Sequence, residues 1–176
     1  GGETLSKVSD LLGIVPVQII NADSFGLVAG DPAFRRRFLD WGVFHVERGF
    51  LDVWRRFQRC LRQRNSLLRA GAISLSELDT WTEELANLGE LISAHRSSYF
   101  DRLVQFFSSV LDKIAPELLA LQVEYFPGWD ETKGLREALE ESRRRDMERG
   151  FTHFGPQRAD IKLLWRDGPA GDTMSR

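Results

Sequence analysis

Apolar residues recur at helical spacing through the middle of this 176-residue chain. A first stripe repeats about every 3.5 residues and consists of Phe50, Trp54, Phe57, Leu61 and Leu68. Arg64 falls on the same stripe and interrupts it. A second stripe consists of Leu78, Trp81, Leu85, Leu88, Ile92, His95 and Tyr99, and it continues, shifted by one position, through Phe100, Leu103, Phe107, Val110 and Ile114. Both stripes predict long amphipathic helices.

Capping and breaking residues set the expected ends of these helices. The Asp31–Pro32 pair is a good helix start, because proline is tolerated in the first turn. Gly49 predicts a bend before the first stripe, and Gly71 predicts the end of that stripe's helix. Either Ser74 or Ser76 can begin the next helix, with Glu77 nearby.

The two long helices are separated by about six residues, so we expect them to fold back on each other. The second runs from residue 77 to residue 114, where Pro116 stops or kinks it. This arrangement predicts a short antiparallel coiled-coil arm. An ordinary helical bundle without an arm remains open as an alternative.

Short segments that resemble strands flank the helical block, and the first of them is rich in β-branched residues. Strands are predicted at residues 15–20, 121–126 and 161–165, and a highly charged helix is predicted at residues 131–149. The order is therefore strand, helical block, strand, helix, strand. This order predicts an α+β, mainly α-helical fold in which an antiparallel helix hairpin is flanked by strands.

Charge is distributed unevenly along the chain. Residues 35–69 contain ten arginines and three acidic residues, whereas residues 70–142 contain five basic and fourteen acidic residues. The formal net charge of −2 therefore hides a basic block beside an acidic one. Such a total excludes a uniformly basic protein that wraps nucleic acid.

The basic block holds the candidate binding residues. Arg55, Arg59 and Arg62 follow one another at spacings of three or four residues, so they line one face of a helix. Arginine forks fit phosphate oxygens, which makes DNA contact one hypothesis. The competing hypothesis is pairing with the acidic helix at residues 77–90. The candidates for DNA contact are Arg35, Arg36, Arg37, Arg55, Arg59 and Arg62.

Other chemistry finds little support in the sequence. The three histidines lie in different elements without ligand spacing, so a metal site is not expected. The single cysteine, Cys60, excludes an internal disulfide and favours a reducing, cytoplasmic setting. No apolar run is long enough to span a membrane, and no glycine-rich phosphate-binding loop is present.

Several segments together resemble the RecF family of bacterial DNA replication and repair proteins. They are VPVQII (15–20), DPAFRRRFLDWGVFHVE (31–47), LRQRNSLLR (61–69), PGWD (127–130), RRRD (143–146) and GPQRADIKL (155–163). They occur in the family's order and cover nearly the whole chain. One departure is Gln157, where the family usually has histidine.

The resemblance implies an ABC-type ATPase head of the SMC group, of which this chain is a central fragment. Residues 1–30 would be a strand and loop of the head, residues 31–150 the helical arm lobe, and residues 151–176 the returning strands that lead to a truncated signature loop. Gln18 matches the Q-loop glutamine, and Ser175 matches the signature serine that contacts ATP. The phosphate loop and the Walker B strand would lie outside the chain, so the fragment itself is expected not to hydrolyse ATP.

The resemblance also implies a mechanism for the complete protein. ATP with Mg²⁺ would join two heads into a homodimer on gapped duplex or on a junction of single-stranded and duplex DNA. RecR and RecO would then help load the recombinase during recombinational repair and the SOS response. The alternative is a non-catalytic helical interaction module whose basic stripe binds a protein partner or its own acidic hairpin.

Overall fold

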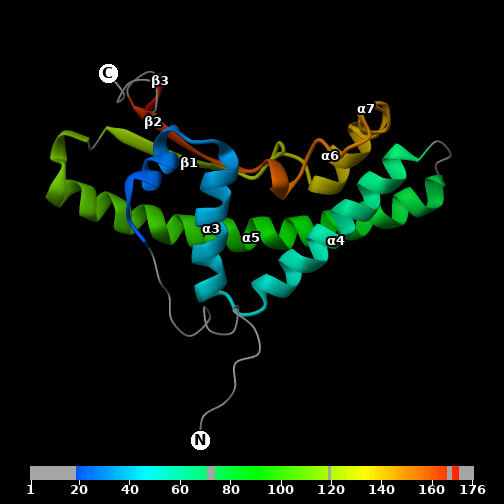
Figure 1. Ribbon diagram of the computed structural model, residues 1–176, viewed down its shortest axis with the longest axis horizontal. Coiled ribbons are helices and arrows are strands. Elements are labelled where there is room, and N and C mark those ends of the chain that lie inside the picture. Colours follow the sequence, from blue (N-terminus) through cyan, green and yellow to red (C-terminus); the bar gives the residue numbers. More distant parts are fainter. Residues whose placement is uncertain (1–18, 71–73, 119, 166–167, 171–176) are drawn as a thin grey trace, which may run out of the picture.

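The computed structural model describes residues 19–70, 74–118, 120–165 and 168–170 (Figure 1). A long helix forms the axis, and shorter helices and a small sheet pack along it (Figure 1). In chain order the elements are η1 (Ala22–Phe25), α2 (Gly26–Ala29), α3 (Pro32–Val46), α4 (Phe50–Arg69), α5 (Leu75–Ile114), η2 (Pro116–Leu118), β1 (Leu121–Phe126), α6 (Leu135–Glu141), α7 (Arg143–Arg149), η3 (Pro156–Arg158), β2 (Asp160–Trp165) and β3 (Gly168–Pro169).

Local signals place α3 and its junction with α4 as the sequence predicts. The side chain of Asp31 accepts a hydrogen bond from the Phe34 amide at 2.9 Å, and Pro32 occupies the first turn of α3. Gly49 has a φ of 89°, a left-handed conformation that glycine adopts without a steric penalty. The chain therefore bends at Gly49 between α3 and α4.

The predicted hairpin is confirmed. Helix α5 has 40 residues and so spans about 60 Å at 1.5 Å per residue. Its first turn is capped by Ser74, whose hydroxyl accepts from the Glu77 amide at 3.3 Å, and it ends at Ile114 before Pro116. Helix α4 packs along the first half of α5, and α6 and α7 contact the same pair. The hairpin is thus the centre of a packed helical lobe.

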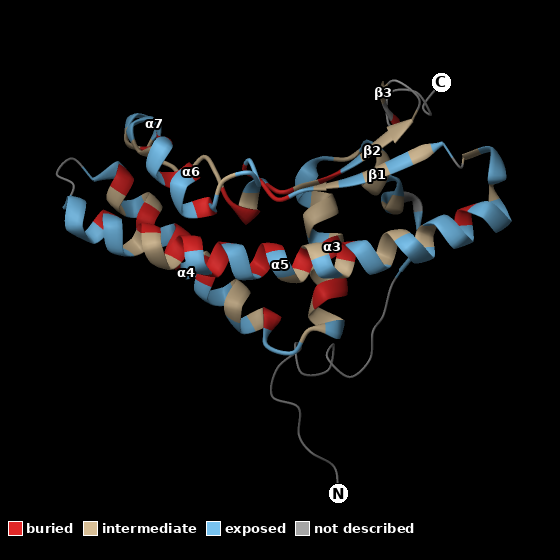
Figure 2. Cartoon of the chain, turned by 180° about the vertical axis from the view of Figure 1, so that it is seen from behind, coloured by how far each residue is buried: buried red, intermediate tan, exposed pale blue. Residues whose placement is uncertain are grey.

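The main core lies between α4, α5 and α6. Phe57 of α4, Leu85 and Ile92 of α5, and Leu135 and Leu139 of α6 are almost completely buried there. The distal half of α5 differs, because of its residues beyond Phe100 only Leu111 is buried. Figure 2 shows this contrast, with buried positions gathered where α4 and α5 pack and exposed positions along the far end of α5.

A second, smaller core lies under the sheet. Strands β1 and β2 pair antiparallel, with Leu121 opposite Trp165 and Phe126 opposite Asp160. Side chains alternate between the two faces of β1, and Val123 and Tyr125 pack toward Phe100 of α5. These two strands confirm the predictions at residues 121–126 and 161–165, and β3 adds a short antiparallel pairing to β2.

Two expectations require correction. The single helix predicted at residues 131–149 begins only at Leu135 and is interrupted at Ser142. The Ser142 hydroxyl donates to the Leu139 carbonyl at 3.3 Å, and such insertion into the backbone ladder bends a helix. Ile19 and Ile20 lie outside any strand, and the rest of the strand predicted at residues 15–20 lies outside the described residues.

Candidate nucleic-acid interface

The outer face of α4 carries the predicted arginine row. Arg55, Arg59 and Arg62 are all exposed and project away from the face that Phe57 and Leu61 bury against α5. Arg55 approaches Asp52 at a distance of 3.9 Å. Arg59 and Arg62 make no ion pair with any residue that the structure describes. The row is therefore an available patch of positive charge on a regular helix.

The acidic part of α5 is neutralised mainly by other basic residues. Glu84 pairs with Arg56 at 2.7 Å, whereas Glu83 and Asp79 pair with arginines of α6 and α7, Arg136 and Arg143. Pairing across the hairpin therefore involves Arg56 and leaves Arg55, Arg59 and Arg62 aside. This observation weakens the hypothesis that the row serves only the chain's own acidic helix.

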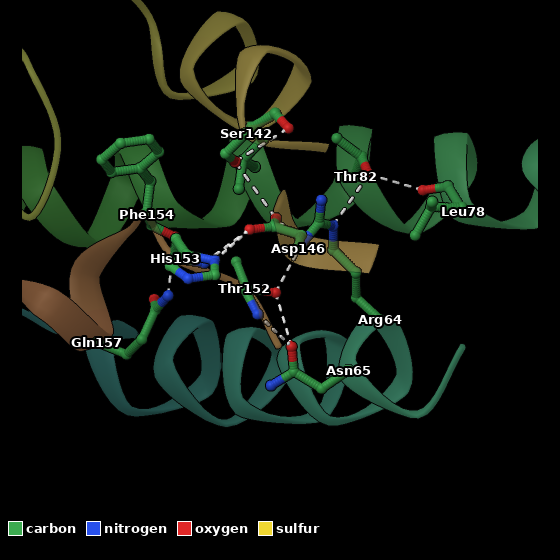
Figure 3. Close-up of polar contacts among 11 residues, drawn as sticks. Arg64, Asn65, Leu78, Thr82, Ser142, Asp146, Thr152, His153, Phe154 and Gln157 are labelled. Carbon is green, nitrogen blue, oxygen red and sulfur yellow. Dashed lines mark hydrogen bonds and ion pairs between the residues drawn. The ribbon is translucent and has the colours of Figure 1, made fainter. Parts of the chain in front are cut away.

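The inner face of α4 holds a different arginine. Arg64 is completely buried, and its Nη1 lies 2.8 Å from Oδ2 of Asp146, which is also fully buried. The same guanidinium donates to the hydroxyls of Thr152 at 2.7 Å and Thr82 at 3.1 Å (Figure 3). Arg64, which interrupts the apolar stripe in the sequence, thus forms a buried ion pair, and its bonds join α4 to α5 and α7.

Neighbouring polar groups complete this buried cluster. The second carboxylate oxygen of Asp146 accepts from the His153 amide at 3.1 Å and lies 2.7 Å from His153 Nδ1 (Figure 3). The Asn65 side chain accepts from the Thr152 amide at 2.8 Å and from its hydroxyl at 2.7 Å. These bonds connect the segment after α7 to α4. They fix the position of α4, the helix that carries the outer arginines.

The three consecutive arginines of α3 have separate environments. Arg35 binds Asp160 through two parallel hydrogen bonds of 2.7 and 3.0 Å and also donates to the Gly30 carbonyl at 2.6 Å. Arg36 is half-buried and donates to the Ala159 carbonyl at 2.8 Å. Arg37 is exposed, with its guanidinium 5.6 Å from the centre of the Phe34 ring. The fork of Arg35 is thus occupied within the fold, while Arg37 faces solvent.

The remaining candidates are two residues predicted to bind nucleotide and the single cysteine. Gln18 and Ser175 lie outside the described residues. Cys60 is buried, its thiol donates to the Trp81 carbonyl at 3.3 Å, and burial raises the pKa of the thiol to about 12. Among the described residues, no group of three histidine, cysteine, aspartate or glutamate side chains could hold a metal ion, and no helix is long and apolar enough to cross a membrane.

Comparison with known proteins shows which family the chain is similar to. No protein-family model matches the chain. Proteins named DNA replication and repair protein RecF align with 99% of its length, with identities of 45% for Marinomonas sp. (strain MWYL1), 45% for Azotobacter vinelandii (strain DJ) and 43% for Chromohalobacter salexigens. The chain belongs to the RecF family. It spans about half the length of these relatives, covering 47% to 48% of each.

Solved RecF structures have the same fold. The recombination mediator protein RecF-ATP of the RecFOR pathway superimposes on 87% of the chain with a TM-score of 0.75 and 22% identity. A second structure, RecF-ATPrS of the same pathway, superimposes on 91% with a TM-score of 0.79 and 25% identity. The chain covers 44% and 46% of these two proteins. The resemblance carried by the sequence motifs and the mainly helical α+β fold are therefore confirmed.

Proposed function

We propose that this chain is the helical part of a RecF-type DNA-repair protein and that it contacts DNA through the outer face of α4. The observation that carries the proposal is the row of Arg55, Arg59 and Arg62, which is exposed and points away from the core. The row spans about 10 Å along the axis of α4, at 1.5 Å per residue. The buried Arg64–Asp146 pair beneath it holds α4 in place.

Phosphate recognition explains why such a row suits DNA. Each guanidinium presents a planar fork of donors that matches phosphate oxygens, and it stays charged at every physiological pH. Neutralising a phosphate releases condensed counterions, so affinity falls steeply as salt rises. Phosphate contacts carry no sequence information, so the proposed contact positions the protein on the DNA backbone without selecting a sequence.

The activity of the complete protein is part of the proposal. We infer that ATP with Mg²⁺ closes two heads into a homodimer on gapped duplex, that Gln18 and Ser175 contribute to the nucleotide sites, and that RecR and RecO then assist recombinase loading. The ATP-bound RecF structures support the nucleotide part of this inference. Residues 1–30 and 151–176 would belong to the head and residues 31–150 to the helical lobe, and the chain alone would not hydrolyse ATP.

The experiment compares DNA binding by three versions of the chain. Fluorescence anisotropy with a labelled gapped duplex is measured from low to moderate salt for the native chain and for Arg55→Ala/Arg59→Ala/Arg62→Ala. A matched control, Arg102→Ala/Arg136→Ala/Arg144→Ala, removes the same charge from exposed positions outside α4. We expect the α4 variant to lose about 0.9 units of log–log salt slope per lost phosphate contact, while the control keeps most of its slope.

Three outcomes would contradict the proposal. Equal losses in both variants would mean that DNA senses only net charge and not the outer face of α4. Unchanged binding in the α4 variant would place the DNA contact elsewhere and would favour the alternative of a helical interaction module. A folded native chain that binds no duplex even at low salt would also contradict the proposed DNA contact and favour the interaction module.

A further inference from the structure

A small cavity lies where α3, the first turns of α4, the middle of α5 and the turn at residues 155–157 meet. Its volume is about 220 Å³. Its wall includes Arg36 and Arg37 of α3, Trp54 and Gln58 of α4, and Gln157 of the turn. Four elements that are distant in sequence thus place charged, amide and aromatic groups around one space, a combination that is typical of a ligand site.

One charge pair in the cavity wall is already neutralised. Arg96 binds Asp40 through hydrogen bonds of 2.7 and 3.0 Å. Its remaining terminal nitrogen, Nη1, donates a hydrogen bond of 2.8 Å to the Pro156 carbonyl. Burial opposes the charged form of Arg96, but the ion pair with Asp40 raises its pKa above the usual value. Arg96 and Asp40 therefore hold the turn in place and leave no net charge for a ligand.

The other two arginines form no ion pair within the described chain, although the nearby carboxylates of Asp160 and Asp31 act to raise the pKa of Arg36. Arg36 donates to the Ala159 carbonyl, and among the described residues no carboxylate lies within ion-pair distance of it. Burial lowers the pKa of the Arg36 guanidinium, and the nearby charge of Arg96 lowers it further. Arg37 is exposed beside it. An anion in the cavity would offset the cost of placing these guanidinium groups together.

The amide groups supply hydrogen bonds of both kinds. Gln157 donates through Nε2 to the Phe154 carbonyl at 2.8 Å, whereas its Oε1 is shielded from solvent and accepts no hydrogen bond from the chain. A buried acceptor without a donor is costly. Because a backbone phosphate has no N–H or O–H group, only an N–H of an adjoining base could satisfy this oxygen. Gln58 adds a second amide, and Trp54 offers an aromatic surface.

The cavity adjoins the arginine row on α4. Gln58 lies three residues after Arg55 and four before Arg62, so it neighbours both on the helix surface. We propose that the cavity binds one phosphate of a nucleic-acid backbone that runs along this row, with Arg36 and Arg37 contacting the phosphate and Trp54 the adjoining sugar or base. The inference rests on the proposed DNA contact and deepens it, since it assigns a defined phosphate seat.

The main test replaces Arg37, because its exposed guanidinium stabilises no other part of the fold by a hydrogen bond or ion pair within the described chain. Arg37→Gln and Gln58→Ala are compared with Arg144→Gln, an exposed position on α7. In anisotropy with gapped duplex, we expect Arg37→Gln to bind about tenfold more weakly and to lose about one unit of salt slope. Gln58→Ala is expected to weaken binding severalfold without changing the slope, and Arg144→Gln to change neither.

The second readout does not depend on the α4 row. Proton–nitrogen NMR of the arginine Nε–Hε groups follows Arg36 and Arg37 while the native chain is titrated with the dinucleotide pdTpdT or with inorganic phosphate. We expect both resonances to shift with pdTpdT at lower concentration than with inorganic phosphate, and the Trp54 indole resonance to shift with pdTpdT alone. Thermal melting checks that every variant folds.

The outcomes separate this inference from the proposed function. Loss of binding in the α4 triple variant but normal binding in Arg37→Gln and Gln58→Ala would overturn the phosphate seat and leave the DNA contact standing. No DNA binding by the native chain, together with shifts of Arg36 and Arg37 by pdTpdT, would retain the seat and reject the α4 surface. Equal shifts with inorganic phosphate and pdTpdT would reject a nucleic-acid seat in favour of a free-anion site.

Discussion

The two faces of α4 use the same residue type for opposite purposes. Arg62 and Arg64 are two residues apart, which places them about 200° apart around the helix. Arg62 is exposed and unpaired within the described chain, whereas Arg64 is fully buried and bonded to Asp146, Thr152 and Thr82. The contribution of an arginine is therefore set by the face of the helix that it occupies.

Different physics governs the two faces. A buried charge loses its hydration and is tolerated only when a partner and further hydrogen bonds compensate, so removing either partner leaves an uncompensated charge in the core. An exposed arginine keeps its hydration, and its interactions are screened by salt. The inner face therefore contributes to the free energy of unfolding, and the outer face is the one that we propose for binding DNA.

The largest effect is expected from Arg64→Ala. Its loss leaves Asp146 buried without its cation, which costs about 3–5 kcal/mol of unfolding free energy. Urea denaturation followed by circular dichroism measures this change. The triple variant of the outer face serves as the contrast, since each of its surface substitutions should shift the unfolding free energy by about 0.5 kcal/mol or less.

A paired replacement sharpens this prediction. Arg64→Met/Asp146→Leu removes both charges together, and we expect it to be much less destabilising than either single change, because no lone charge remains. Were Arg64→Ala as stable as the native chain, the buried pair would not be what holds α7 to α4.

An intermediate effect is expected from Gly150→Ala, at the end of α7. Gly150 has a φ of 72°, and an added Cβ would lie 2.9 Å from Cγ of Arg69. The left-handed conformation costs an alanine about 1–2 kcal/mol, and the change perturbs the helix that delivers Asp146 to the inner face. Urea denaturation of Gly49→Ala is the control, since Gly49 is also left-handed but has open space around it. Equal losses would show that the contact with Arg69 adds nothing to the backbone cost.

The smallest effect is expected at Arg56, on the edge between the two faces. Its ion pair with Glu84 has a short distance of 2.7 Å, but both side chains are largely exposed. Solvent screening limits such a pair to about 0–1 kcal/mol. A double-mutant cycle with Arg56→Ala and Glu84→Ala, measured at low and high salt, isolates the coupling energy. A coupling energy that is unchanged at high salt would show that this pair behaves like the buried Arg64–Asp146 pair and not like an exposed one.

Local sequence signals determined much of the framework. The Asp31 and Ser74 caps, the bend at Gly49 and the stop before Pro116 all act through groups within a few residues, so the pattern of the chain predicted them. The segment LQVEYF at residues 121–126 likewise predicted β1. The spacing of Arg55, Arg59 and Arg62 placed them on one face for the same reason: helical periodicity is a local property.

Tertiary structure alone decided which charges are available. Asp146 lies 82 residues from Arg64, and Asp160 lies 125 residues from Arg35, so no local spacing relates these partners. The cavity beside Gln157 also depends on packing between distant segments. Helical periodicity is a short-range property, whereas burial of a charge depends on which distant groups the fold brings to it.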